Sequence, residues 1–179
     1  MRIIAGSARG RRLDPPTWEG LRPTSDKLRE TLFNVIAARV PEARVLDLFA
    51  GTGAIGLEAL SRGAAHATFV ESEPRAVALI VHNAERCGLA SRCVIIRDTA
   101  ERALHHRMND ALFDVVVLDP PYDFQPLDAV LSSAARRLAP EGLLILEHAF
   151  RRSPPVVEST RLARTVRSGD SALTLFEAV

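Results

Sequence analysis

Four residues that could take part in binding or catalysis directly follow the apolar run 115–118, and they are Asp119, Pro120, Pro121 and Tyr122. Proline has no amide hydrogen, so both prolines must lie beyond the last hydrogen-bonded position of a central strand. Two interpretations are open at this point. The prolines are a simple strand stop, or they form a rigid shelf that holds the Asp119 carboxylate and neighbouring carbonyl oxygens towards a bound molecule.

A glycine-rich segment, DLFAGTGAIG (47–56), follows a second apolar run and opens a predicted helix. Gly51, Gly53 and Gly56 satisfy G-x-G-x-x-G, a pattern shared by several kinds of nucleotide site. Asp47 lies four residues before Gly51, where its charge would repel a pyrophosphate on the loop. The same charge suits an ammonium group, such as that of S-adenosylmethionine (SAM). The segment therefore favours SAM over a dinucleotide.

Two further carboxylates end the next two predicted strands. Glu71 is followed by Ser72, and Asp98 is followed by Thr99. Each carboxylate alone is also a plausible helix cap, but the carboxyl ends of parallel strands meet at one edge of a sheet, where ligands bind. We therefore expect Glu71 to accept hydrogen bonds from ribose hydroxyls and Asp98 to meet the adenine amino group.

Strand-like and helix-like segments alternate around these motifs, which predicts a parallel sheet covered by helices on both faces. Two final strand-like segments, 162–167 and 172–179, have no helix between them and should form an antiparallel hairpin at the sheet edge. The fold class is thus α/β and Rossmann-like, with a seven-stranded, mostly parallel sheet. The other expected strands are 44–49, 67–71, 93–98, 113–119 and 142–148, and the helices are 54–62, 74–86, 99–107 and 126–138.

The first residues are expected to form a small basic β-hairpin over 2–13, followed by a linker. We place a boundary after residue 20, so that 21–179 is the catalytic domain. The domain opens with a helix capped by Thr24 or Ser25. The first twelve residues contain no acid and four arginines, which are Arg2, Arg9, Arg11 and Arg12.

Composition excludes several classes of protein. The net charge is +1 and 47% of the residues are apolar, typical of a soluble domain without a membrane span or signal peptide. The spacing of Cys87 and Cys93 suits neither a metal site nor a disulfide framework, so we expect a cytoplasmic protein without a metal. Five arginines between 151 and 167 oppose the single acid Glu158. Basic clusters at both ends suggest a phosphate-rich partner.

Taken together, the motifs resemble those of methyltransferases that act on an amino group conjugated to a planar π-system. Over essentially its whole length the chain resembles the bacterial 16S rRNA (guanine-N2)-methyltransferase family. The resemblance implies methyl transfer from SAM to N2 of one guanine, with S-adenosylhomocysteine as the second product. It also implies that the protein acts on the small ribosomal subunit or its assembly intermediate. Nothing in the sequence suggests an obligate assembly, so we expect a monomer. The segments that carry it include RIIAGSARGRRL (2–13), RPTSDKLRETLFN (22–34), DLFAGTGAIGLEALSRGA (47–64), DPPY (119–122) and SGDSALTLFE (168–177).

The chain departs from the family at Ser168, where an aromatic residue is usual before Gly169-Asp170.

The resemblance also implies a catalytic or binding role for individual residues. The amine site would comprise Asp119, Pro120, Pro121 and Tyr122. The cofactor site would comprise Thr24, Asp47, Gly51, Gly53, Glu71, Ser72, Asp98, Thr99 and Asp119, and the RNA contacts Arg2, Arg9, Arg11, Arg12 and Arg22.

Two alternatives to rRNA methylation remain open. An amino-methyltransferase could act on a DNA base or a protein glutamine, although the chain carries no target-recognition domain for sequence-specific work on DNA. A non-catalytic RNA-binding assembly factor could retain a vestigial cofactor pocket. The intact set Asp47, Gly51, Gly53, Glu71 and Asp119 argues against that second alternative.

Overall fold

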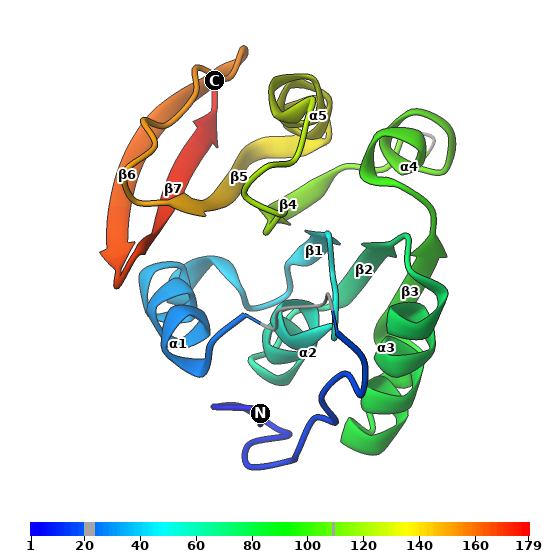
Figure 1. The fold of residues 1–179 in the computed structure, drawn as a ribbon. Helices are drawn as coiled ribbons and strands as arrows, with labels where there is room; N and C mark the ends of the chain where they lie inside the picture. The colour runs from blue at the N-terminus through cyan, green and yellow to red at the C-terminus, as the bar shows by residue number, and fades with distance from the viewer. Residues whose placement is uncertain (20–23, 109) are drawn as a thin grey trace.

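The structure is a computed structural model that describes residues 1–19, 24–108 and 110–179. Within these ranges, seven strands form one sheet in the order β3-β2-β1-β4-β5-β7-β6 (Figure 1). The strands are β1 (Arg44–Leu48), β2 (His66–Glu71), β3 (Cys93–Arg97), β4 (Phe113–Leu118), β5 (Leu138–Ala149), β6 (Thr160–Ser168) and β7 (Ser171–Ala178). The helices are α1 (Asp26–Val35), α2 (Ala54–Ser61), α3 (Pro74–Cys87), α4 (Ala100–His106) and α5 (Leu127–Ala135), with short 3₁₀ turns at Ala37–Arg39 and Ala90–Arg92.

The sheet has the predicted mixed topology. Strands β1 to β5 pair in parallel, whereas β7 runs antiparallel to both β5 and β6. Strand order reverses between β1 and β4, which lie side by side although two βα units separate them in the chain. Ligands of such sheets bind in the crevice beyond the carboxyl ends of the strands at this switch point. The Rossmann-like fold with an antiparallel edge hairpin is confirmed.

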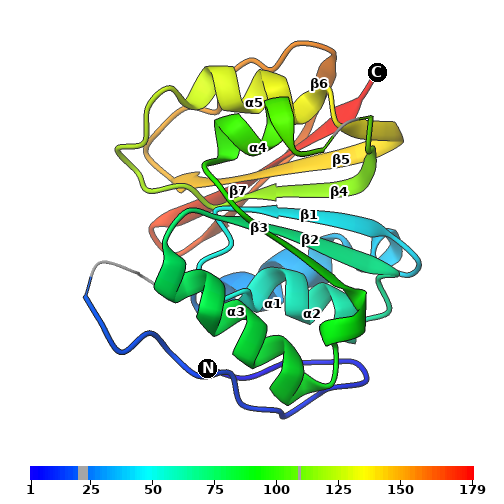
Figure 2. The same ribbon diagram turned by 90° about the vertical axis from the view of Figure 1, so that its right-hand side faces the viewer.

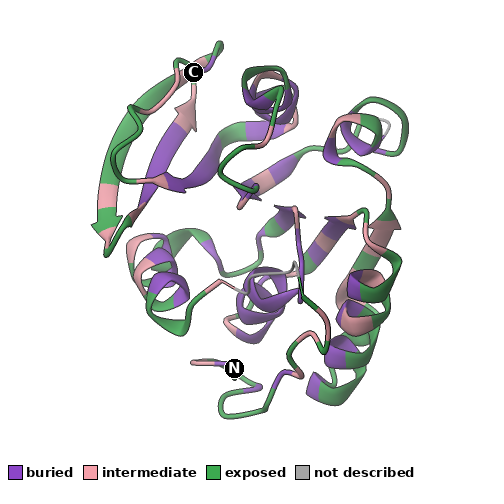
Figure 3. Ribbon diagram, viewed as in Figure 1, coloured by how far each residue is buried: buried purple, intermediate pink, exposed green. Residues whose placement is uncertain are grey.

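Helices cover both faces of the sheet, as Figure 2 shows. Helices α1, α2 and α3 lie on one face together with the N-terminal segment, and α4 and α5 lie on the other. Strand side chains alternate between the two, so Val117 of β4 packs in one apolar cluster and Val116 in the other. Figure 3 shows that burial follows the strands and the inward sides of the helices. Each fully buried aliphatic side chain stabilises the fold by roughly 1.5–3 kcal/mol.

The N-terminal segment 1–13 folds back on itself, but with less strand than expected. One antiparallel bridge, Arg2–Arg12, replaces the two predicted strands. The amides of Ile4 and Ala5 donate instead to the Glu58 carboxylate of α2, at 2.7 and 3.0 Å. The side chains of Ile3, Ala8 and Leu13, in the same segment, are buried in the apolar cluster on the face of the sheet that α1, α2 and α3 cover. The domain boundary after residue 20 stays a prediction, since 20–23 lie outside the described ranges.

Two element boundaries differ from the sequence expectation by more than two residues. Helix α5 ends at Ala135 and strand β5 already begins at Leu138, whereas the apolar pattern predicted a helix through 138. Leu138 pairs with Phe113 of β4, and the register then shifts before the regular pairs resume at Val115. Glu141 adopts a φ of 62° within this irregular part. Pairing with a distant strand, which a local pattern does not report, decides the boundary.

Helix α1 begins at the predicted position. The Ser25 hydroxyl accepts a hydrogen bond from the Leu28 amide at 3.1 Å, so Ser25 rather than Thr24 is the N-cap. Thr24 therefore lies one residue before the N-cap. No helix in the described part of the chain is both long and apolar enough to cross a membrane.

Candidate active site

A cavity of about 390 Å³ lies at the carboxyl edge of the sheet, between the ends of β1 and β4 and the start of α1. Its volume falls in the range of roughly 300–1,000 Å³ typical of small-molecule sites. Of the residues predicted for the cofactor and amine sites, the lining includes Thr24, Asp47, Gly51, Glu71, Ser72, Asp119, Pro120, Pro121 and Tyr122. It therefore joins the glycine-rich segment and the Asp-Pro-Pro-Tyr segment in one space.

The loop between β1 and α2 requires glycine at two positions. Gly51 and Gly53 have φ values of 56° and 77°, in the left-handed region that favours glycine. The Gly51 amide donates to Glu71 Oε2 at 2.8 Å, while Glu71 Oε1 accepts from the Glu73 amide at 2.9 Å. These two bonds orient the Glu71 carboxylate at the rim of the cavity, and its remaining lone pairs can accept ribose hydroxyls. Gly53 does not line the cavity but starts α2.

Asp47 is the buried acid of the site, with 1% of its surface exposed. Its Oδ2 accepts a hydrogen bond from the Gly56 amide at 2.9 Å, whereas Oδ1 is buried and has no hydrogen-bond partner. Burial, with the nearby charges of Asp119 and Glu71, raises the pKa of Asp47 to about 7, although the Gly56 bond acts in the opposite direction. A cation bound in the cavity would remove this penalty.

Asp119 and Thr24 come together from positions far apart in the chain. The Thr24 hydroxyl donates to Asp119 Oδ2 at 2.5 Å. Thr24 was predicted as a cofactor contact; it lines the cavity, and the contact stays a prediction. Its hydrogen bond adds a second role, because it orients the carboxylate of the Asp-Pro-Pro-Tyr segment. Pro120 is buried and Pro121 is exposed, so Pro120 anchors the Asp-Pro-Pro-Tyr segment in the core.

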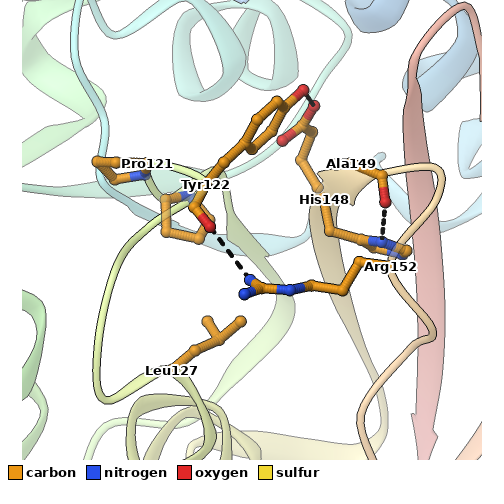
Figure 4. Close-up of a pocket in the computed structure, with 8 residues that line it drawn as sticks. Pro121, Tyr122, Leu127, His148, Ala149 and Arg152 are labelled. Carbon is orange, nitrogen blue, oxygen red and sulfur yellow. Dashed lines mark hydrogen bonds between the residues drawn. The ribbon is translucent and has the colours of Figure 1, made fainter.

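Tyr122 is held by two strands on the far side of the cavity. Its hydroxyl donates to Glu147 Oε1 at 3.1 Å and lies 2.9 Å from Ser171 Oγ. Arg152 Nη1 donates to the Tyr122 carbonyl at 3.2 Å. Figure 4 shows Pro121, Tyr122 and Arg152 around a smaller adjoining pocket, with the bonds to Tyr122 dashed. The side chain of Tyr122 is 44% exposed, which leaves ring surface for a planar ligand.

Sequence reasoning missed Glu147, Ser171 and Phe49, all of which line the cavity. Phe49 has a φ of 63° at the end of β1 and contacts Phe124 edge-to-face, with ring centroids 4.8 Å apart. A left-handed conformation is costly for a bulky residue and clusters at functional sites. The only local indication for Glu147 was an acid inside an otherwise apolar strand.

Asp98 and Thr99 are not brought to the cavity lining. The Asp98 carboxylate lies 3.1 Å from Arg102 Nε and 3.3 Å from Arg107 Nε. Desolvation opposes ionisation here, but the bonds from Arg107 and the Thr99 amide and the charge of Arg102 together hold the pKa of Asp98 below its usual value. Thr99 caps α4 by accepting from the Arg102 amide at 3.3 Å. Their assignment to the adenine stays a prediction.

The N-terminal segment carries four of the predicted RNA-binding arginines, Arg2, Arg9, Arg11 and Arg12. All four are exposed. Arg11 donates to the Arg86 carbonyl near the end of α3, at 2.8 Å. Arg22 lies outside the described residues. In the described part of the chain, no three His, Cys, Asp or Glu side chains are grouped so as to hold a metal ion.

Comparisons with known proteins decide the family. The family model described as "Conserved hypothetical protein 95" matches residues 1–177. Ribosomal RNA small subunit methyltransferase D of Escherichia coli is 34% identical over 184 aligned positions, which cover 99% of this chain and 89% of that protein. The chain belongs to the ribosomal RNA small subunit methyltransferase D family. The resemblance drawn from the sequence motifs is thus confirmed.

Other members of the family agree with this placement. The putative rRNA methyltransferase YlbH of Bacillus subtilis is 39% identical over 151 residues, covering 83% of this chain and 82% of that protein. A solved structure, the putative methyltransferase yhhF from Escherichia coli, superposes with a TM-score of 0.87 at 35% identity. The match covers 99% of this chain and 97% of that one, so the fold is shared from end to end.

Proposed function

We propose that this protein transfers the methyl group of SAM to the exocyclic N2 of a guanine in 16S rRNA, within the small ribosomal subunit or its assembly intermediate. The observation that carries the proposal is the single cavity that joins Asp47, Gly51 and Glu71 to Asp119 and the following prolines. A cofactor bound against the glycine-rich loop would lie directly beside an amine held at the Asp-Pro-Pro-Tyr segment. The names of the relatives support the choice of rRNA as the substrate.

The residues of the cavity fit SAM. The unpaired, buried Oδ1 of Asp47 would accept the ammonium group of its methionine part, and Glu71 would accept the ribose hydroxyls. Three carboxylates, those of Asp47, Glu71 and Asp119, line the same space. They complement a molecule that carries both an ammonium and a sulfonium group. When bound, SAM supplies an electrophilic methyl group on its sulfonium sulfur.

Asp119 and Pro120 would prepare the amine for attack. The lone pair of an exocyclic amine is delocalised into the base, so the amine is a poor nucleophile. Hydrogen bonds from its N–H groups to the Asp119 carboxylate and the Pro120 carbonyl would orient the nitrogen and stabilise the positive charge that develops there. The Asp119 carboxylate can then take the proton that the amine must lose. The consecutive prolines and the Thr24 hydroxyl hold these acceptors in place beforehand, and positioning supplies most of the rate.

The exposed face of Tyr122 would stack on the target base. A base in a helix must first be unstacked or flipped to enter such a pocket. The exposed arginines of the N-terminal segment, which are Arg2, Arg9, Arg11 and Arg12, would bind the phosphates around it. Such contacts position the RNA without reading its sequence.

Methylation of ribosomal particles tests the proposal. Purified protein and labelled SAM are incubated with small subunits from a strain that lacks the modification, and the product is identified by nucleoside chromatography. We expect N2-methylguanosine, and mass mapping then locates the modified guanine. Unmodified particles would contradict the proposal. Label in a DNA base or a protein glutamine would favour the alternative enzyme, and calorimetry without SAM binding would favour a non-catalytic assembly factor.

A further inference from the structure

Asp119, which follows β4, and Glu147, which lies near the carboxyl end of β5, are neighbours in the sheet. The two strands pair in register through Leu118 and Leu146, so Asp119 and Glu147 occupy adjacent positions one residue later. Both side chains line the cavity. Asp119 belongs to the segment that would hold the amine, whereas the proposed function has so far given Glu147 no role towards the substrate.

The two oxygens of the Glu147 carboxylate differ in their surroundings. Oε1 accepts the hydrogen bond of the Tyr122 hydroxyl at 3.1 Å. Oε2 is buried and has no hydrogen-bond partner, and the residue as a whole is only 5% exposed. A buried charged acceptor without a donor is destabilising, and such groups in native proteins call for an explanation. A donor supplied by the substrate would provide it.

Guanine presents such a donor at the required place. Its ring N1–H lies directly beside the N2 amine, so these two neighbouring groups are both donors. In adenine and cytosine, the ring nitrogen beside the exocyclic amine is an acceptor. A carboxylate beside the amine site would therefore accept a hydrogen bond from guanine and repel the lone pair of the other two bases.

We propose that Glu147 is a specificity-determining residue, whose Oε2 accepts the N1–H of the target guanine while Asp119 and Pro120 hold its N2. The inference rests on the proposed function and adds the reason that this site takes guanine. The Tyr122 hydroxyl occupies Oε1 of the Glu147 carboxylate and leaves Oε2 to the base, while the tyrosine ring stacks on that base. Ser171 Oγ, 2.9 Å from the same hydroxyl, completes the support from β7.

A base analogue removes the N1–H donor. 2-Aminopurine keeps the exocyclic amine at the same position but has a bare acceptor nitrogen at N1 and no O6, so the substitution of Glu147 described below is needed to assign a preference to N1. Small-subunit particles are reconstituted with either guanine or 2-aminopurine at the mapped target position, and kcat/KM is measured for each. We expect the wild-type protein to prefer guanine on the order of 10- to 100-fold, the value of one hydrogen bond to a charged group. Equal rates on both particles would overturn the inference, whatever the behaviour of any variant.

Glu147→Gln tests the residue itself, since the glutamine amide has the same shape and can donate to an acceptor nitrogen. The preference for guanine over 2-aminopurine should fall at least about tenfold, to the level expected after loss of one such bond. Glu85→Gln is the matched control, because Glu85 is exposed on α3 and does not line the cavity. It should keep the wild-type ratio. SAM binding by calorimetry checks that each variant is folded.

Tyr122→Phe distinguishes two possible roles of Glu147, which are to accept a hydrogen bond from the base and to hold the Tyr122 hydroxyl. It removes the hydroxyl bonded to Glu147 and keeps the carboxylate, so its guanine preference should persist even if its rate falls. A Tyr122→Phe ratio that drops together with that of Glu147→Gln would reduce Glu147 to a positioning residue and overturn the inference. If the wild-type product is not N2-methylguanosine, the proposed function fails. If it is, but Glu147→Gln leaves the ratio unchanged, the inference alone fails.

Discussion

Asp119 and Asp47 line the same cavity, but their surroundings differ. Asp119 follows the end of β4, is partly exposed and is oriented by the Thr24 hydroxyl. Asp47 lies within β1, is fully buried and has one oxygen without a partner. The first can therefore accept the amine of an incoming base, whereas the second can only meet a group that penetrates to the floor of the cavity. Substitutions of the two should affect different steps.

Replacement of Asp119 should impair turnover more than cofactor binding. Asp119→Ala removes an acceptor for the charge that develops on the amine, so kcat should fall about 10²- to 10³-fold, as for loss of one group that stabilises a transition state. SAM affinity by calorimetry and RNA affinity should stay within a few-fold of wild type. Asp123→Ala, an exposed carboxylate one residue after Tyr122, is the control. Turnover that survives in Asp119→Ala would exclude Asp119 from catalysis.

SAM affinity should depend on pH through Asp47. Burial raises the pKa of this carboxyl to about 7 in the ligand-free protein, so below that pH it is neutral and must release a proton before it can pair with an ammonium group. Affinity should therefore fall as the pH is lowered from 8 to 5, by up to about tenfold per pH unit. Calorimetry in buffers of different ionisation enthalpy should detect the released proton. An affinity independent of pH would contradict the assignment.

The same carboxyl also predicts how stability changes with pH. An acid with a raised pKa binds more protons in the folded than in the unfolded state between its ordinary value of 3.8 and about 7, so its contribution to stability falls as the pH rises through this window. Asp47→Asn keeps an acceptor for the Gly56 amide and removes the charge. At pH 8 its unfolding midpoint should exceed that of the ligand-free wild type, and the gain should shrink towards pH 4. SAM binding should be weaker in this variant.

At the scale of elements, an ionic cluster joins α1 and α2 to the N-terminal segment. Glu58 of α2 accepts the two amides of residues 4 and 5 and lies 2.7 Å from Arg62 Nε and 3.6 Å from Arg29 Nη1. Arg29 of α1 is fully buried and donates to the Arg2 carbonyl at 2.9 Å. The start of α1 carries Thr24 and Ser25 into the cavity. The cluster therefore fixes one wall of the site together with the basic segment.

Glu58→Gln should destabilise the protein substantially. The glutamine keeps the shape of the side chain but has no charge to pair with Arg29 and Arg62, and its amide group cannot accept all three hydrogen bonds that the carboxylate accepts. Asp26 Oδ1, 2.6 Å from Arg29 Nη2, still offsets part of the Arg29 charge. We therefore expect a loss of about 3 kcal/mol in the free energy of unfolding, measured by urea denaturation, at the lower end of the cost of breaking a buried ion pair. Glu85→Gln, on the exposed side of α3, should change it by less than about 0.5 kcal/mol. Equal midpoints for the two variants would contradict this role.

At the scale of the whole molecule, charge is divided between the cavity and the surface. Acids line the cavity, while the exposed arginines of the N-terminal segment lie on the face of the sheet that carries α2 and α3. Further arginines, Arg161, Arg164 and Arg167, lie on the edge strand β6. The near-neutral chain can thus attract a polyanion to its surface and still bind a cationic cofactor in its interior.

Removal of surface charge should weaken RNA binding in a salt-dependent way. Arg9→Ala with Arg12→Ala is the preferred pair, because Arg11 also bonds to the Arg86 carbonyl and its loss would disturb α3. Affinity should fall, and the slope of log K against log salt should decrease by roughly one per lost phosphate contact. The control Arg136→Ala, at the C-cap of α5 on the other face of the sheet, should leave the slope unchanged. A slope unchanged in the double variant would remove these arginines from the RNA interface.

Features that depend on neighbouring residues were predictable from the amino-acid sequence. The alternation of strands and helices follows from burial periodicity, and the end of β4 follows from two prolines that lack amide hydrogens. The glycine-rich loop and the acids Asp47, Glu71 and Asp119 could be placed at one edge, because parallel strands end together. The family resemblance then added the chemistry of the substrate.

Features that depend on distant partners emerged only from the packed chain. Tyr122 meets Glu147 and Ser171 across 25 and 49 residues of sequence, and Thr24 meets Asp119 across 95. Asp98, which has the same strand-end position as Glu71, is instead held by two arginines of the helix that follows. A local pattern reports which backbone groups pair and which side chains are buried. The partner of a polar side chain is set by how sheet order and helix packing bring segments together, and this is what separates Glu71, which faces the cavity, from Asp98, which pairs with arginines.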